Sequence, residues 1–196
     1  MSFLKSVAEE EANGDVADLY RREIERVGYL PNYSRTFSLH PQAYRAWRDL
    51  IASIAKAMDE RRYELATLAA AARLRSSACA LAHGSILEEK FFEPDEVAQI
   101  ARGEGPSVLD PTEALVVEFA AKVVGDATEV TEDDIHRLRA AGLSDRDILD
   151  VVLAAAARSF FSKVLDATGT LADAVYGEMD TDLREALTIG RPIADG

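Results

Sequence analysis

The sequence predicts an all-α fold, a compact domain of about eight or nine helices. Helix start signals recur along the chain, apolar residues repeat at helical spacings of three and four, and the alternating pattern of a β-strand is missing. The 196 residues are 48% hydrophobic, which is enough for one sizeable core. We therefore expect residues 1–196 to form a single helical domain.

Four helices are predicted in the first ninety residues, at 15–27, 41–58, 60–74 and 77–89. The first is closed by Gly28, and the second opens at Pro41, because proline suits the first helical turn. Trp47 and Ile51 recur at helical spacing along the second helix. The third and fourth helices form a motif region at 60–90, which contains the candidate functional residues.

A second helical half is predicted at about 110–170, after one short helix that Gly103 closes. Asp110 and Glu113 place carboxylates at the N-cap and N3 positions around a proline, which is typical of a helix start. Gly142 ends the helix before the last long run. The helices of this part are expected to begin at Pro94, Asp110, Thr131 and Ser144, and the last one runs to Leu165.

The word Leu-Ala-Ala-Ala-Ala-Arg occurs twice, at 68–73 and at 153–158. This repetition hints at two related helical hairpins. If the halves correspond, Cys79 matches Val164 and His83 matches a threonine, so the chemistry would lie in the first half only.

The chain contains a single cysteine, Cys79, in a segment that predicts reactive chemistry. On a helix, Ser76, Cys79 and His83 share one face because they are three, four and seven positions apart. Glu64 would lie roughly 18 Å below Ser76 on one straight helix, so it joins them only if the chain breaks near the two serines. Either serine could cap a new helix, and Cys79 in its first turn would be favoured as the reactive thiolate.

The spacing of these residues resembles the alkyl hydroperoxidase D and carboxymuconolactone decarboxylase superfamily, within it the peroxidase-related branch. Its motif is a glutamate, an eleven-residue gap and Cys-x-x-Cys-x-x-x-His, which falls on Glu64, Ser76, Cys79 and His83. The first cysteine of the motif is serine here. The resemblance covers most of residues 15–175 and includes Leu30 to Arg35, His40-Pro41, Val116 to Lys122 through Leu143 to Asp145, and Phe160 to Ala167.

The resemblance implies a role for each motif residue. Cys79 would attack a hydroperoxide, while Glu64 and His83 relay the proton. In the family the position of Ser76 is a cysteine that resolves the sulfenic acid as a disulfide, and this chain has no second thiol. Any peroxidase cycle must then be of a one-cysteine type. An outside thiol such as glutathione, a thioredoxin-like protein or Cys79 of another subunit would resolve it. The resemblance also implies a homo-oligomer.

Each of these residues also has a purely structural interpretation. Cys79 could be a small core hydrophobe, Ser76 a helix cap and Glu64 a solvated carboxylate of a first helical turn. A metal site of Cys79, His83 and Glu64 is a weak signal, because three mixed ligands lack a paired spacing. We therefore expect no metal and no cofactor. The segments 30–33 and 160–161 are candidates for pocket walls or for ordinary core aromatics.

Three classes of function remain open from the sequence. The first is a peroxidase that reduces alkyl hydroperoxides with Cys79. The second is a lyase or isomerase like the family's decarboxylase branch, in which Glu64 and His83 move protons without a thiol. The third is a protein that keeps the fold to bind a small ligand without catalysis.

Charge and composition limit the partners. The formal net charge of −13 argues against nucleic acid, because binding to phosphate backbones requires a basic surface. The first residues lack the apolar core of a signal peptide, and no apolar run reaches the length of about 18 residues typical of a membrane span. A lone cysteine fits a reducing cytoplasm. We expect a cytoplasmic protein whose partners are a small hydroperoxide and an external thiol.

Overall fold

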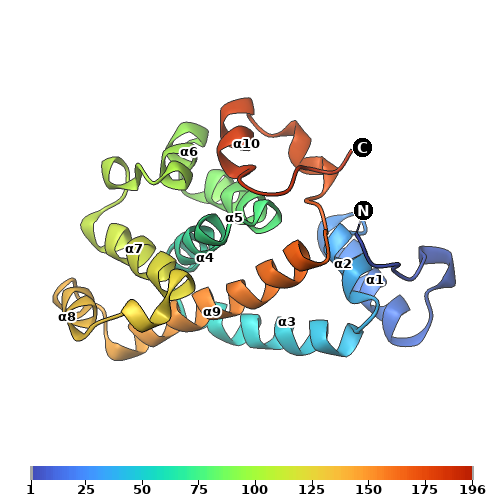
Figure 1. Cartoon of the computed structure of the whole chain (residues 1–196), viewed down its shortest axis with the longest axis horizontal. Helices are drawn as coiled ribbons and strands as arrows, with labels where there is room; N and C mark the ends of the chain where they lie inside the picture. The colour runs from blue at the N-terminus through green and yellow to red at the C-terminus, as the bar shows by residue number, and fades with distance from the viewer. Residues whose placement is uncertain (1, 196) are drawn as a thin grey trace.

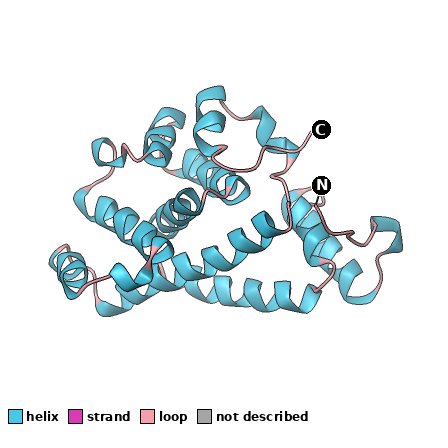
Figure 2. Cartoon of the chain, viewed as in Figure 1, coloured by secondary structure: helices cyan, strands magenta, loops and turns pink. Residues whose placement is uncertain are grey.

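The computed structural model describes residues 2–195, which form helices joined by short loops (Figure 1, Figure 2). The α-helices are α1 Gly14–Val27, α2 Asn32–Phe37, α3 Pro41–Ala55, α4 Glu60–Leu74, α5 Ser77–Lys90, α6 Pro94–Arg102, α7 Pro111–Gly125, α8 Glu132–Ala140, α9 Asp145–Ala167 and α10 Thr181–Leu187. Four short 3-10 helices, η1 Glu9–Glu11, η2 Gly105–Ser107, η3 Ala127–Glu129 and η4 Ala174–Glu178, lie between them. Within the described part, no helix is both long enough and apolar enough to cross a bilayer.

The predicted all-α fold is confirmed, and each of the eight helices expected from the sequence is present. Their ends agree within a few residues; α3, for example, stops at Ala55 and not at Met58. Two short helices, α2 and α10, were not predicted. Long-range contacts support α2, because the Thr36 hydroxyl hydrogen-bonds to that of Thr170 at 2.6 Å. Such contacts leave no periodic pattern in a segment of six residues.

Helix α4 occupies the centre of the molecule and packs against α5, α7 and α9 (Figure 1). It is buried on nearly all sides, which is typical of a central helix. Three of its alanines, Ala66, Ala70 and Ala71, are fully buried and let the neighbouring helices approach closely. The side chains that α4 carries are therefore surrounded by the other helices of the motif region and the second half.

The chain breaks between α4 and α5, as the sequence predicted. Arg75 has a left-handed backbone, with φ 58° and ψ 39°, and Ser76 is the N-cap residue of α5. The Ser76 amide donates to the Ala71 carbonyl at 3.0 Å, which completes a Schellman turn. The C-terminal segment covers this turn, since the Gly190 amide donates to the Ser77 hydroxyl at 2.8 Å. A Cβ at Gly190 would lie 2.0 Å from the Arg75 carbonyl oxygen, so the covering segment requires glycine there.

The two copies of the repeated word lie on α4 and α9, which pack against each other. The first copy ends at the break after Leu74. The second copy lies inside α9, which continues without interruption to Ala167. The break that positions Cys79 therefore has no counterpart after the second copy.

We predict that Arg75→Gly stabilises the protein. The left-handed conformation costs a non-glycine residue roughly 1–2 kcal/mol, and the extra unfolded-state entropy of glycine offsets part of the gain, so we expect a net increase of about 0.5–1 kcal/mol in the free energy of unfolding. Urea unfolding followed by circular dichroism measures it. Arg75→Ala is the control and should show no gain, because alanine keeps the steric cost. A loss of stability in the glycine variant would contradict the assigned turn.

Candidate functional site

The thiol of Cys79 lies beside the guanidinium of Arg158, which comes from the middle of α9. The Nη1 atom of Arg158 donates to Cys79 Sγ at 3.7 Å. Both side chains are buried: Cys79 is 2% exposed and Arg158 is 5% exposed. Cys79 is the third residue of α5, where backbone N–H groups lack helical partners and the helix dipole is positive. Two positive influences therefore converge on one sulfur atom.

Arg158 has no carboxylate partner among the ion pairs of residues 2–195, and its Nε makes no hydrogen bond there. Its guanidinium instead lies near the faces of Trp47 and Phe161, 5.6 and 5.7 Å from the ring centroids. Burial works to lower the pKa of Arg158, but Cys79 and Tyr63 more than compensate and raise it. The guanidinium stays charged, and a thiolate at Cys79 would be its natural counter-ion.

Glu64 and His83 form a second buried pair. The Nδ1 atom of His83 lies 2.5 Å from Glu64 Oε2. Burial, followed by the positive charge of Arg158, lowers the pKa of His83, although Glu64 opposes this shift. The ring is thus neutral near pH 7, with Nδ1–H donating to the carboxylate. Its Nε2 makes no hydrogen bond to another described residue and can accept a proton.

The structure brings together some of the sequence-predicted site residues but not all. Glu64 and His83 meet, because the break after α4 turns α5 back toward it. Cys79 makes no hydrogen bond to His83 within the described residues; Arg158 holds its sulfur instead. Ser76 takes the expected N-cap position, yet its fully buried hydroxyl forms no hydrogen bond of normal geometry, to the helix or to other described groups. Cys79 with Arg158 and Glu64 with His83 therefore form two sub-sites, and Ser76 belongs to neither.

A small cavity of about 50 Å³ lies next to Cys79. The side chains that line it are Tyr33, Ala78, Cys79, Ala82, Arg158, Phe161, Leu165, Leu171, Ala172, Asp173 and Tyr176. The wall is thus largely apolar, with the thiol, the guanidinium, the Asp173 carboxyl and two tyrosines as polar exceptions. A cavity of this size admits only a small ligand. Tyr33 and Phe161 come from the two segments expected to be pocket walls or core aromatics. They have both roles, since they line the cavity and their rings also contact each other at 5.6 Å between centroids.

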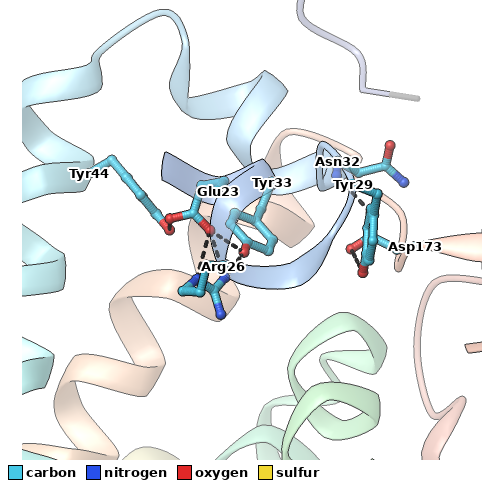
Figure 3. A network of polar contacts seen from close by, with 7 residues as sticks. All are labelled: Glu23, Arg26, Tyr29, Asn32, Tyr33, Tyr44 and Asp173. Carbon is cyan, nitrogen blue, oxygen red and sulfur yellow. Dashed lines mark hydrogen bonds and ion pairs between the residues drawn. The ribbon is translucent and has the colours of Figure 1, made fainter. Parts of the chain in front are cut away.

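A buried network fixes the position of Tyr33 (Figure 3). The Glu23 carboxylate accepts hydrogen bonds from the hydroxyls of Tyr33 and Tyr44, both at 2.8 Å, and from Arg26 at 2.6 Å. Burial alone would raise the pKa of Glu23, but these donors together lower it, so the carboxylate stays charged. At Tyr33 the wall of the cavity is therefore held by a hydrogen-bonded charge.

Sequence reasoning missed Arg158 and Tyr176. Arg158 ends the second copy of the repeated word, and an arginine within a buried alanine-rich stretch was the available signal. Tyr176 lies in η4, a short segment outside the motif region, and no pattern in the sequence connects it to Cys79. Among residues 2–195, no three histidine, cysteine or acidic side chains are placed to hold a metal ion.

Comparison with known proteins identifies the fold. No protein-family model matches the chain, and no curated protein sequence matches it. Among solved structures, a peroxidase-related protein from Ralstonia eutropha, described as an alkylhydroperoxidase AhpD core, matches with a TM-score of 0.81 and 22% identity over 91% of this chain and 95% of that one. A peroxidase-related protein from Silicibacter sp. TM1040 matches with a TM-score of 0.78 and 19% identity, over 89% and 95% of the two chains.

A third solved structure with this fold is a debrominase, Bmp8, as a cysteine-to-alanine variant in complex with 2,3,4-tribromopyrrole. It matches with a TM-score of 0.71 and 12% identity, over 93% of this chain and 94% of that one. The chain therefore has the AhpD-type all-α fold that its sequence resemblance indicated. The same fold is found in proteins described by different reactions, so fold alone does not select one.

The lowered pKa of His83 predicts that this residue makes the folded protein less stable in acid. Because the folded-state pKa lies below the ordinary value of 6.5, the unfolded chain binds the proton first, and stability should fall as the pH drops below about 6.5, by up to about 1.4 kcal/mol per pH unit. His83→Asn keeps an amide donor for Glu64 but does not titrate, so its loss of stability should be smaller. Urea unfolding between about pH 7.5 and 5.5 measures the difference.

His136→Asn is the matched control, because this exposed histidine on α8 should leave the pH dependence of stability as it is in the unmodified protein. The assignment fails if His83→Asn and the unmodified protein lose stability in parallel.

Proposed function

We propose that the protein is a one-cysteine thiol peroxidase that reduces small hydroperoxides with Cys79. One observation carries the proposal: the buried guanidinium of Arg158 has no carboxylate partner within residues 2–195 and donates to Cys79 Sγ at 3.7 Å. A structural cysteine does not need such a neighbour, whereas a nucleophilic thiolate does. The AhpD-type fold of peroxidase-related proteins supports the same reaction class.

The reaction begins with attack of the Cys79 thiolate on the distal oxygen of the hydroperoxide. A sulfur–oxygen bond forms, the oxygen–oxygen bond breaks, and the electron pair leaves with the alkoxide, which takes up a proton to become an alcohol. Sulfur is oxidised to the sulfenic acid and the peroxide is reduced. A first external thiol then displaces water to give a mixed disulfide, and a second one releases Cys79 as a thiol and leaves as a disulfide.

Glu64 and His83 would receive the proton that Cys79 loses. The Nε2 atom of His83 is available, and its Nδ1–H is held by Glu64 at 2.5 Å, the arrangement of a general base oriented by a carboxylate. Because Nε2 and Sγ are not hydrogen-bonded to each other, the proton would travel through a bridging water. Ser76 has no chemical step in this scheme and serves as the N-cap residue of α5.

The size of the cavity favours a small hydroperoxide. About 50 Å³ beside the sulfur is too little for a tribrominated pyrrole such as the ligand of the Bmp8 structure. The apolar wall suits an alkyl group on the peroxide. A thiol-independent lyase and a non-catalytic ligand-binding protein are the other functions that this fold could support, and Cys79→Ser separates them: it abolishes peroxide reduction but leaves a proton-transfer lyase active.

The proposal is tested by mixing reduced protein with a small excess of tert-butyl hydroperoxide and following Cys79 by intact mass, with dimedone to trap the sulfenic acid. We expect rapid oxidation in the unmodified protein. Arg158→Met should slow both oxidation and alkylation by iodoacetamide about tenfold or more, because the thiolate loses its counter-charge. Glu64→Gln and His83→Ala should slow oxidation through the loss of the proton acceptor.

Arg73→Met is the matched control, since Arg73 ends the first copy of the repeated word and its side chain is exposed. It should react like the unmodified protein. Arg158→Lys guards against a folding artefact, because it keeps the charge and should recover part of the rate. Slow oxidation of the unmodified protein, unchanged by Arg158→Met, would refute the proposal.

A further inference from the structure

We propose that Tyr176 is a catalytic residue of this site, the donor that protonates the oxygen leaving the peroxide. The inference rests on the proposed function and adds to it a group outside the motif region. Attack by a thiolate creates negative charge on the departing oxygen, and a positioned proton donor lowers the barrier for this step. Cys79 is already deprotonated at that moment, so the proton must come from another group in the cavity.

Tyr176 lies in the same cavity as the thiol. It belongs to η4, which also contains Gly177 and lies between Asp173 and α10 along the chain. The Tyr176 amide donates to the Asp173 carbonyl at 3.2 Å, and Arg184 of α10 donates to the Gly177 carbonyl at 2.6 Å. The tyrosine is thus mounted on a segment tied at both ends, over a cavity of only about 50 Å³.

The hydroxyl of Tyr176 is present as a donor. Burial, then the charges of Asp173 and Cys79, raise its pKa to about 12, so it remains protonated in the neutral range. Tyr176 and Cys79 line the same small cavity, so the phenol and the sulfur border one space. Within residues 2–195 the hydroxyl makes no hydrogen bond, which leaves its proton available to a ligand in the cavity.

The other polar groups of the cavity are less suited to donate. The Tyr33 hydroxyl is committed to Glu23 at 2.8 Å. The Asp173 carboxyl accepts hydrogen bonds from the Asn32 amide at 2.7 Å and from the Tyr29 hydroxyl at 3.2 Å (Figure 3). The pKa of Arg158 is raised above its already high ordinary value, so it stabilises charge but does not release a proton. Among the residues that line the cavity, Tyr176 is the remaining one that carries a hydroxyl.

The proton transfer is balanced and downhill. As the oxygen–oxygen bond breaks, the electron pair moves to the departing alkoxide, and the Tyr176 hydroxyl gives this oxygen its proton. The products are an alcohol and a phenolate, and the phenolate regains a proton from solvent. A phenol with a pKa of about 12 is more acidic than an alcohol, whose pKa is close to the value of about 15.7 for water.

The test uses the full-length Tyr176→Phe variant and three reagents at Cys79. Iodoacetamide consumes the thiolate without needing a proton donor, so its rate should stay within about twofold of the unmodified protein. Oxidation by tert-butyl hydroperoxide should slow by about 10²-fold, the size of a general-acid effect. Peracetic acid has a far more acidic leaving group, so its reaction should change little. Tyr29→Phe, a tyrosine outside the cavity bound to the same Asp173, is the matched control and should show no such selectivity.

Each outcome has a defined meaning. Slower reaction with all three reagents in Tyr176→Phe would assign a packing role and overturn the inference, as would an unchanged rate with tert-butyl hydroperoxide. In both cases the peroxidase proposal would survive. If no hydroperoxide oxidises the unmodified protein rapidly, the peroxidase proposal itself fails, and the role of Tyr176 fails with it.

Discussion

The buried positive charge of Arg158 is the constraint on which the site depends. A guanidinium that is 5% exposed is costly unless a negative group or strong hydrogen bonds compensate it. Within residues 2–195 no carboxylate does so, and the atom that its Nη1 contacts is Cys79 Sγ. Glu64 contacts His83 instead, and the guanidinium of Arg158 helps to lower the pKa of that histidine. One charge on α9 thus contacts the sulfur of Cys79 and helps to keep the neighbouring imidazole neutral.

The backbone positions the residues that lie around this charge. Helix α4 brings Glu64 into the interior, and the left-handed turn at Arg75 reverses the chain so that α5 returns past the same carboxylate. The turn also places Cys79 at the start of a helix, where the dipole and the unpaired N–H groups favour negative charge. The C-terminal segment covers the turn at Gly190, where there is no room for a side chain. The turn after α4 and the C-terminal segment that covers it therefore position the start of α5, which carries the sulfur atom.

The cavity beside the sulfur is limited by a second buried charge. Glu23 holds Tyr33 and Tyr44 by their hydroxyls, and Tyr33 in turn contacts Phe161, one helical turn beyond Arg158 on α9. This hydrogen-bonded wall limits the cavity on the side of Tyr33. The fold itself does not select a reaction, because the peroxidase-related and debrominase neighbours share it.

The sequence by itself determined the helices and the local turn. Periodic apolar residues, N-cap side chains and glycine stops are local signals, so the eight longer helices, the break near Ser76 and the early position of Cys79 in α5 were all predictable. The sequence allowed Glu64 to meet His83 only if the chain breaks near Ser76, and the structure shows both the break and the meeting. Tertiary structure alone decided which group contacts the thiol. Arg158 reaches the thiol from about 80 residues away, and Tyr176 joins the same cavity from about 100 residues away, through packing that has no period in the sequence. The chain's own pattern had favoured His83.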